Sequence, residues 1–270
     1  MTDRERFRPF TGDTEKRIRL ANAPLALVLC QVRWPDFNHL QGDLTEVAQA
    51  FGSALDEYPL VSRIDEVAYT ITPEGVTQAP GERIYQWRSI DDAWHINLSR
   101  RFASLYCTSY TSFPDLLARL EQALDVIASK VRIPLIERLG IRYVNRLADP
   151  RLVENLAEYV RPEVLGYASL SGETGDAQLV STANHARYMV DDAALQVRSG
   201  LLPADETVDP ALTPLQQSSW VLDLDASLER IMPLDVSAVL AEASRLSDIA
   251  YDFFKYISTE GFLKEFGEDV

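Results

Sequence analysis

Two arginines in one short segment are the side chains best placed to bind an anion. Residues 139–147 read Leu-Gly-Ile-Arg-Tyr-Val-Asn-Arg-Leu, and their alternation of types predicts a strand. Arg142 and Arg146 would share one face of that strand, with Tyr143 and Asn145 on the other. Such a cationic strip could bind a phosphate or an acidic peptide. Alternatively, the two arginines pair with carboxylates on neighbouring strands.

A second cationic pair, Arg100 and Arg101, is followed by Phe102, Tyr106 and Tyr110. Cations interleaved with aromatic side chains are typical of surfaces that stack the bases of single-stranded nucleic acid. A turn followed by a strand with core aromatics would produce the same pattern. The hypothetical binding residues are therefore Arg100, Arg101, Arg142, Tyr143, Asn145 and Arg146.

Histidines and paired acids indicate little further chemistry. His39, His95 and His185 lack partners at metal-ligand spacing, and His95 is expected to be a surface or hydrogen-bonded histidine rather than a base. Asp223 and Asp225 would point to one strand face, where they could hold a divalent cation or simply be solvated. Without a phosphate loop, metal motif or nucleophile elbow, we predict no cofactor, no metal and no catalytic residue.

The elements that would position these residues occur in one order in the first half. Residues 25–33 predict a strand, and apolar residues at helical spacing predict a helix over 37–57. Ser112 and Asp115 have the spacing of a helix N-cap. Strands are expected near 64–72, 82–89, 93–99 and 102–109, ahead of the helix that begins after Ser112.

The second half follows the same order. Residues 139–147 predict a strand, and Leu152, Leu156 and Val160 suggest a helix. Asp235 is the expected N-cap of a long final helix. Strands are expected near 177–182, 186–190, 193–200 and 217–225.

Two local matches support an internal duplication. Residues 31–33 align with 144–146, and residues 94–99 align with 220–225. The unequal offsets require an insertion, and the acidic loop 201–214 has the right place for it. The predicted class is α+β, with a duplicated strand–helix–antiparallel-strands–helix unit whose helices pack on one face of curved antiparallel sheet. The predicted segments are a flexible arm over 1–20, repeats over 21–132 and 133–260, and an acidic tail over 261–270.

Charge narrows the choice of partner. The 270 residues include 26 basic and 41 acidic side chains, a net charge of −15, which argues against a protein held on DNA by overall charge. Residues 1–150 hold 18 basic and 20 acidic side chains, whereas residues 151–270 hold 8 and 21. This asymmetry predicts a polarised field that attracts a cationic partner. The alternative is that the acids serve solubility alone.

Cysteine usage and hydropathy indicate a cytoplasmic protein. Cys30 and Cys107 lie in strand-like stretches and predict two buried free thiols. The charged N-terminus has no apolar h-region, and the longest apolar run, residues 23–30, is far too short to span a membrane. We therefore expect no membrane contact.

The chain also carries a set of short motifs. They are Pro24-Leu25, Trp94-x-Ile-x-Leu-Ser99, Phe102-Ala-Ser-Leu105, Tyr110-Thr111 with Phe113, and Gly140-Ile-Arg-Tyr-Val-Asn145. Over residues 21–258 this set resembles a sporadically distributed prokaryotic family of uncharacterised proteins of similar length. Its most distinctive part is the pattern at 142–145, which residues 29–33 lack. The resemblance implies no known activity, and the scattered occurrence implies a toxin–antitoxin or phage-defence context.

Together these patterns predict a non-enzymatic binding or regulatory protein that presents an acidic surface to a macromolecular partner. The expected partner is a protein; nucleic acid is disfavoured by the net charge, and a homo-oligomer is open. One alternative is a nucleic-acid or nucleotide binder that uses the arginine strip. The other is a hydrolase whose site is assembled from distant residues.

Overall fold

The computed structural model describes residues 10–11, 20–72, 75–170 and 177–267. In the first half most of the expected elements are present. They are β1 (Leu25–Arg33), the short turn η2 (Asn38–Leu40), α1 (Thr45–Gly52), β2 (Leu60–Thr72), β3 (Gly75–Arg88), β4 (Trp94–Leu98), β5 (Phe102–Cys107), α2 (Phe113–Val126) and the π turn η3 (Ile127–Val131).

The second half begins with the long strand that carries the predicted arginine strip. Its elements are β6 (Leu135–Leu147), α3 (Pro150–Glu154), α4 (Leu156–Tyr159), η4 (Pro162–Val164), η5 (Gly166–Leu170), β7 (Asn184–Val190), β8 (Ala193–Leu202), β9 (Ser219–Pro233), α5 (Val236–Ile257) and α6 (Glu260–Glu265).

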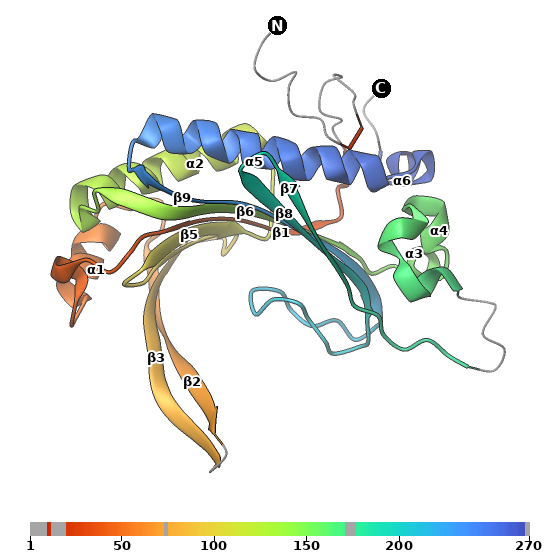
Figure 1. Cartoon of the computed structure of the whole chain (residues 1–270), viewed down its shortest axis with the longest axis horizontal. Coiled ribbons are helices and arrows are strands. Elements are labelled where there is room, and N and C mark those ends of the chain that lie inside the picture. Colours follow the sequence, from red (N-terminus) through yellow and green to blue (C-terminus); the bar gives the residue numbers. More distant parts are fainter. Residues whose placement is uncertain (1–9, 12–19, 73–74, 171–176, 268–270) are drawn as a thin grey trace, which may run out of the picture. The chain divides into compact units, whose positions relative to one another are not determined.

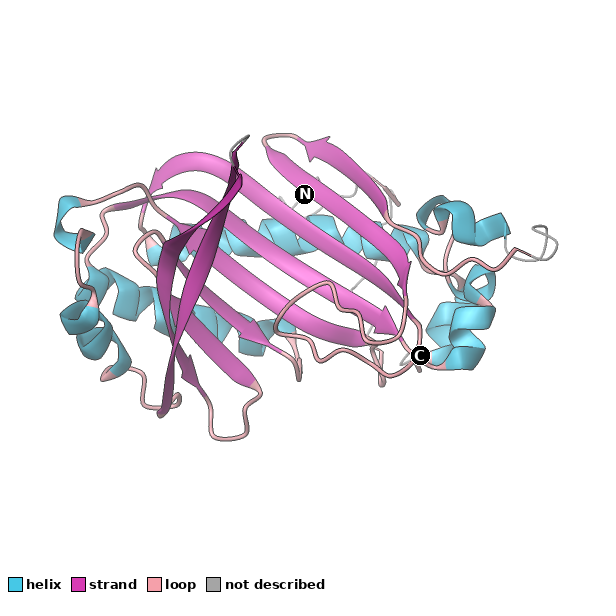
Figure 2. Cartoon of the chain, turned by 90° about the horizontal axis from the view of Figure 1, so that it is seen from below, coloured by secondary structure: helices cyan, strands magenta, loops and turns pink. Residues whose placement is uncertain are grey.

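The strands form one antiparallel sheet of nine in the order β2-β3-β4-β5-β1-β6-β9-β8-β7 (Figures 1 and 2). The α+β class is thereby confirmed. Two capping predictions are also confirmed: the Ser112 hydroxyl accepts the N–H of Asp115 at 3.3 Å, and Asp235 Oδ1 accepts the N–H of Ala238 at 2.9 Å. These polar side chains satisfy N–H groups that the first turn of a helix leaves unpaired.

The helix predicted over 37–57 is much shorter than expected. Gly42 adopts a φ of +86°, a conformation that ends the η2 turn and that side chains with a Cβ rarely adopt. Helix α1 then begins at Thr45, whose N–H donates to Asp43 Oδ1 at 3.0 Å. Apolar spacing alone could not reveal this interruption.

β3 runs through Pro80 and Gly81, where the sequence predicts a break. Its pairing with β2 shifts register between Asp65 and Val67, opposite this point. β4 pairs with β3 only over Tyr85–Arg88, so Pro80 lies where β3 has a single neighbouring strand. A residue without an N–H is tolerated at a bulge or at a strand edge.

Two further expectations differ from the structure, and a third falls largely outside the described residues. Residues 177–183 form no strand, although Thr182 donates its N–H to Leu201 O at 3.1 Å. The expected acidic tail begins with helix α6, which Thr259 caps and which buries Phe262. Of the expected arm over 1–20, only residues 10, 11 and 20 lie within the described part; Phe10 packs edge-on against Phe253 at 5.0 Å.

The chain forms two compact units, each assembled from separate segments. The terminal unit comprises Met1–Val28, Ile141–Leu228 and Ser244–Val270, and the ribbon unit comprises Leu29–Gly140 and Glu229–Ala243. Each unit contains a fully buried tryptophan, Trp220 in the terminal unit and Trp34 in the ribbon unit. Trp34 Nε1 donates to Arg100 O at 2.8 Å, which satisfies its buried polar atom.

The strand order agrees with only one of the two repeat alignments. β1 and β6, which contain the first matched pair of segments, are neighbours at the middle of the order. The second alignment matches β4 with β9. Since β9 adjoins β6 whereas β5 separates β4 from β1, these two strands hold different positions, and that alignment is wrong.

Candidate functional site

The most distinctive feature of the ribbon unit is a long two-stranded ribbon, β2 and β3. The two strands pair from Leu60 with Arg88 to Thr72 with Gly75. β4 pairs with β3 only over the last four residues of β3, so most of the ribbon has no third strand among the described residues (Figure 1). Two-stranded hairpins are marginally stable alone in water, so a ribbon of this length needs further support.

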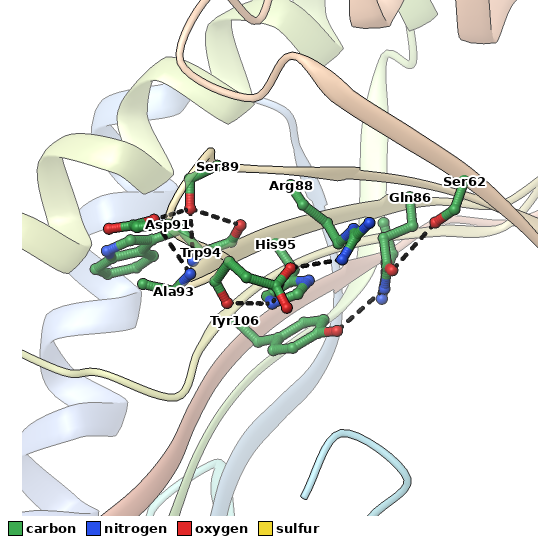
Figure 3. Close-up of polar contacts among 11 residues, drawn as sticks. Ser62, Gln86, Arg88, Ser89, Asp91, Ala93, Trp94, His95 and Tyr106 are labelled. Atoms are coloured by element: carbon green, nitrogen blue, oxygen red, sulfur yellow. Dashed lines mark hydrogen bonds and ion pairs between the residues drawn. The ribbon is translucent and has the colours of Figure 1, made fainter.

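A polar network holds the root of the ribbon to the sheet (Figure 3). Ser62 on β2 donates to Gln86 on β3 at 3.3 Å. The Gln86 amide donates to Asn97 on β4 at 3.1 Å and to the Tyr106 hydroxyl on β5 at 3.0 Å. Asn97 in turn donates to Ser104 at 3.3 Å. The network therefore crosses four strands and fixes the base of the ribbon.

His95 lies beside this network, in the row of Arg88 and Tyr106. Its Nε2 is 2.9 Å from Asp92 O, and because a carbonyl only accepts, Nε2 must carry the proton. The ring stacks on Tyr106 with centroids 4.5 Å apart. Burial lowers the pKa of His95, so the ring is neutral at pH 7. Nδ1 is then a buried acceptor that no group in the described residues satisfies.

The turn from β3 to β4 is braced by acidic side chains. Asp92 takes a positive φ of 58° and accepts from Arg88 Nη1 at 2.6 Å. Asp91 accepts from the Ser89 hydroxyl at 2.5 Å and from the Ala93 N–H at 3.2 Å (Figure 3). These bonds lower the pKa of Asp91. The hydrogen bonds of the turn and of the polar network together fix the conformation of the ribbon at its root.

The outer strand of the ribbon exposes apolar side chains at this ordered root. Leu60, Val61 and Ile64 are 41%, 63% and 43% exposed. β2 is the last strand of the sheet, and no strand in the described residues pairs with its outer edge. An edge with unpaired N–H and C=O groups and exposed apolar side chains is a template for another strand. We therefore take the outer edge of β2 as the candidate functional site.

The predicted arginine strip on β6 is used inside the terminal unit. Arg142 Nε and Nη2 donate to the two oxygens of Asp223 at 2.8 and 3.0 Å, and Nη1 donates to Asp209 at 2.5 Å. Burial would lower the pKa of Arg142, but the two carboxylates outweigh it and raise that pKa. Asp223 also pairs with Arg198 at 3.3 Å. For Arg142, the alternative of pairing with carboxylates is the one that the structure shows.

The other predicted residues of β6 also have internal partners. Arg146 donates to Ser219 at 3.0 Å and to the carbonyls of Thr213 and Glu206 at 3.0 and 3.1 Å, which holds the loop between β8 and β9. The Tyr143 hydroxyl lies 2.7 Å from that of Ser247 on α5, and Asn145 is buried. Arg142 and Arg146 thus both donate hydrogen bonds to the loop between β8 and β9.

Arg100 and Arg101 lie in the turn between β4 and β5, in the ribbon unit. Arg100 Nη2 donates to Gly42 O at 3.4 Å. Arg101 lies 3.9 Å from Asp36 and 3.7 Å from Glu137. Tyr106, expected as a stacking platform, instead stacks on His95 and is 8% exposed. The alternative of a turn before core aromatics is the better description.

Other candidate chemistry finds little support in the described residues. No three histidine, cysteine, aspartate or glutamate side chains there are grouped to hold a metal. Cys30 and Cys107 are buried free thiols, as predicted, and burial raises the pKa of Cys30 to about 12. The hollows of the terminal unit include one of about 280 Å³ beside His185 and Arg198 and one of about 390 Å³ beside Arg146 and Glu265.

Comparison of the chain with models of protein families, with curated proteins and with solved structures found no match. No helix of the described residues is long and apolar enough to cross a membrane. The resemblance based on short motifs stays a prediction. Local patterns in the sequence do not predict the edge of β2, because its position at the end of the sheet depends on the order in which the strands pair.

Proposed function

We propose that this chain is a non-enzymatic binding protein that engages a protein partner through the β2–β3 ribbon. The observation that carries the proposal is the unpaired outer edge of β2, with its exposed Leu60, Val61 and Ile64. Main-chain groups of a sheet edge bind an added strand, and alternate side chains give that binding its specificity. The polar network at the ribbon root supports this role by holding the edge in place before binding.

The negative charge of the chain is spread over both compact units, so the units do not form the polarised field that the sequence halves predict. Counted by unit, the terminal unit holds 15 basic and 23 acidic side chains, and the ribbon unit holds 11 and 18. The net charges of −8 and −7 are nearly equal, so the asymmetry between sequence halves does not correspond to the compact units. Both units are therefore acidic, and the net charge does not distinguish the edge of β2 from the rest of the chain.

The nucleotide-binding alternative has weaker support. Its main residue, Arg142, is compensated by two carboxylates, and its second, Arg146, is bonded to loop carbonyls. We also propose an internal duplication that keeps the match of β1 with β6 and replaces the match of β4 with β9 by one of β5 with β9. The strand order, with β1 and β6 at its middle, supports that correspondence.

The test is the double substitution V61K/I64K, which places two charges at exposed apolar positions of the β2 edge. We expect it to keep a cooperative melt, since both substituted positions are exposed, and to lose proteins captured by the wild-type chain from the native host. Met189→Lys is the control: it adds a charge at an exposed strand position outside the ribbon, and should keep the captured proteins. Identical capture by the wild-type chain and by a folded V61K/I64K variant would overturn the proposal.

A further inference from the structure

We infer that the outer edge of β2 pairs with β2 of a second copy of this chain, antiparallel and centred on Ile64. This inference rests on the proposed function, because it names an occupant for the same edge. A twofold axis makes such an interface self-complementary: the central residue faces itself, and its two neighbours face each other crosswise.

The sequence of the edge selects the register. With Ile64 at the centre, Arg63 of each copy lies opposite Asp65 of the other, so two opposite-charge pairs form by symmetry. The half-exposed Ile64 side chains would meet at the axis. Moving the centre to Arg63 would place Asp65 opposite Val61 and the two arginines opposite each other. Of these two registers, only the one centred on Ile64 is favourable.

The present contacts of these side chains leave capacity for the second copy. Arg63 lies over the Tyr85 ring at 5.5 Å and has no ion pair within the described residues. Asp65 pairs with Arg83 at 2.7 Å, but both side chains are more than half exposed. A carboxylate has lone pairs for a second cation. The overall charge of −15 opposes self-association at long range, but screening at physiological salt limits this repulsion to about 8 Å.

Charge reversal tests the pairing through the oligomeric state. Sedimentation of the full chain over a wide concentration range should show a monomer–dimer equilibrium of the 30.3 kDa chain. Arg63→Glu places like charges opposite each other twice and should weaken the dimer about tenfold. The swap R63E/D65R, with R83E added so that residue 65 keeps an opposite charge within its own ribbon, should restore most of that loss. Arg187→Glu, the same charge change on exposed β7, should leave the dimer unchanged.

Cysteine cross-linking tests the register directly. Directly opposed residues of antiparallel strands have Cα atoms about 4.5–5.5 Å apart, within reach of a disulfide. Ile64→Cys should therefore form a covalent dimer under mild oxidation, whereas Val61→Cys, which would lie about 20 Å from its own copy in this register, should not. The native thiols are buried and should not compete.

The outcomes separate this inference from the proposed function. A monomeric chain whose ribbon still captures a different protein overturns the inference and leaves the proposed function intact. A dimer that neither Arg63→Glu nor the swap affects, or that cross-links equally through both cysteine variants, also overturns the inference. A monomeric chain with no ribbon-dependent capture overturns both.

Discussion

At the residue scale, Arg142 of the predicted cationic strip forms an internal ion pair with Asp223. Their side chains are 14% and 3% exposed. Removing Asp223 leaves the buried guanidinium of Arg142 with the Asp209 carboxylate in place of two carboxylates. Asp223 lies on β9, whereas Asp209, the second partner of Arg142, lies in the loop between β8 and β9. Arg142 therefore connects that loop to the sheet.

We predict that Asp223→Ala lowers the free energy of unfolding by about 3 kcal/mol, because Arg142 then loses its bidentate partner. Urea denaturation followed by circular dichroism measures this change. Glu242→Ala, which removes the more exposed pair with Arg230, should cost less than about 1 kcal/mol. Equal effects of the two substitutions would contradict the role assigned to Asp223.

His95 predicts a pH dependence of stability. Burial holds its pKa below the ordinary value of 6.5, so the unfolded chain binds a proton at a higher pH than the folded chain does. Stability from the neutral ring is thus fully present above pH 6.5 and is lost as the pH falls toward the folded pKa.

The measurement is urea denaturation of wild type, His95→Gln and His185→Gln at several pH values from 7 to 5. His95→Gln should flatten the decline in stability over this range, and His185→Gln, at an exposed position of β7, is the matched control. If the slope of wild type persists in His95→Gln, another group causes it.

At the element scale, helix ends were readable because their signals are local. Ser112 and Asp235 are polar side chains one residue before the first helical turn, and both accept the N–H that their spacing predicts. The bounds of α1 depend on the positive φ of Gly42. The bounds of β3 depend on its pairing, since β4 reaches only Tyr85–Arg88 and leaves Pro80 beside one strand of the described residues. Neither feature produces a repeating pattern of apolar residues from which the sequence could predict it.

We predict that Ser112→Ala destabilises the chain by about 1 kcal/mol, since the N–H of Asp115 at the start of α2 loses its acceptor. Ser112→Asp keeps a side-chain acceptor and should cost only a few tenths of that. Thermal and urea unfolding of both variants provide the test. Indistinguishable variants would show that the cap contributes nothing measurable to α2.

At the scale of the whole molecule, the two compact units do not follow the sequence halves. Strands β1, β6 and β9 and helix α5 each contribute residues to both units. Leu234, far along the chain, donates to Pro134 O within the ribbon unit at 3.0 Å. A boundary between residues 132 and 133 would therefore remove parts from each unit.

We predict that residues 21–132 and residues 133–260, produced separately, do not unfold cooperatively. The first fragment lacks 229–243 of the ribbon unit, and the second lacks 1–28 of the terminal unit, including Phe10 against Phe253. Thermal circular dichroism and heteronuclear NMR of each fragment are the measurements. A sharp melt from either fragment alone would show that the repeats fold independently.

The sequence by itself determined the features that depend on near neighbours: the class, most strands, the two helix caps and the burial of both thiols. Periodicity and capping act over a few residues, so the local pattern contains their cause. Only the tertiary structure decided which side chain Arg142 meets, that β2 ends the sheet, and how charge divides between the units. Those outcomes depend on contacts between residues tens of positions apart, which no local pattern encodes.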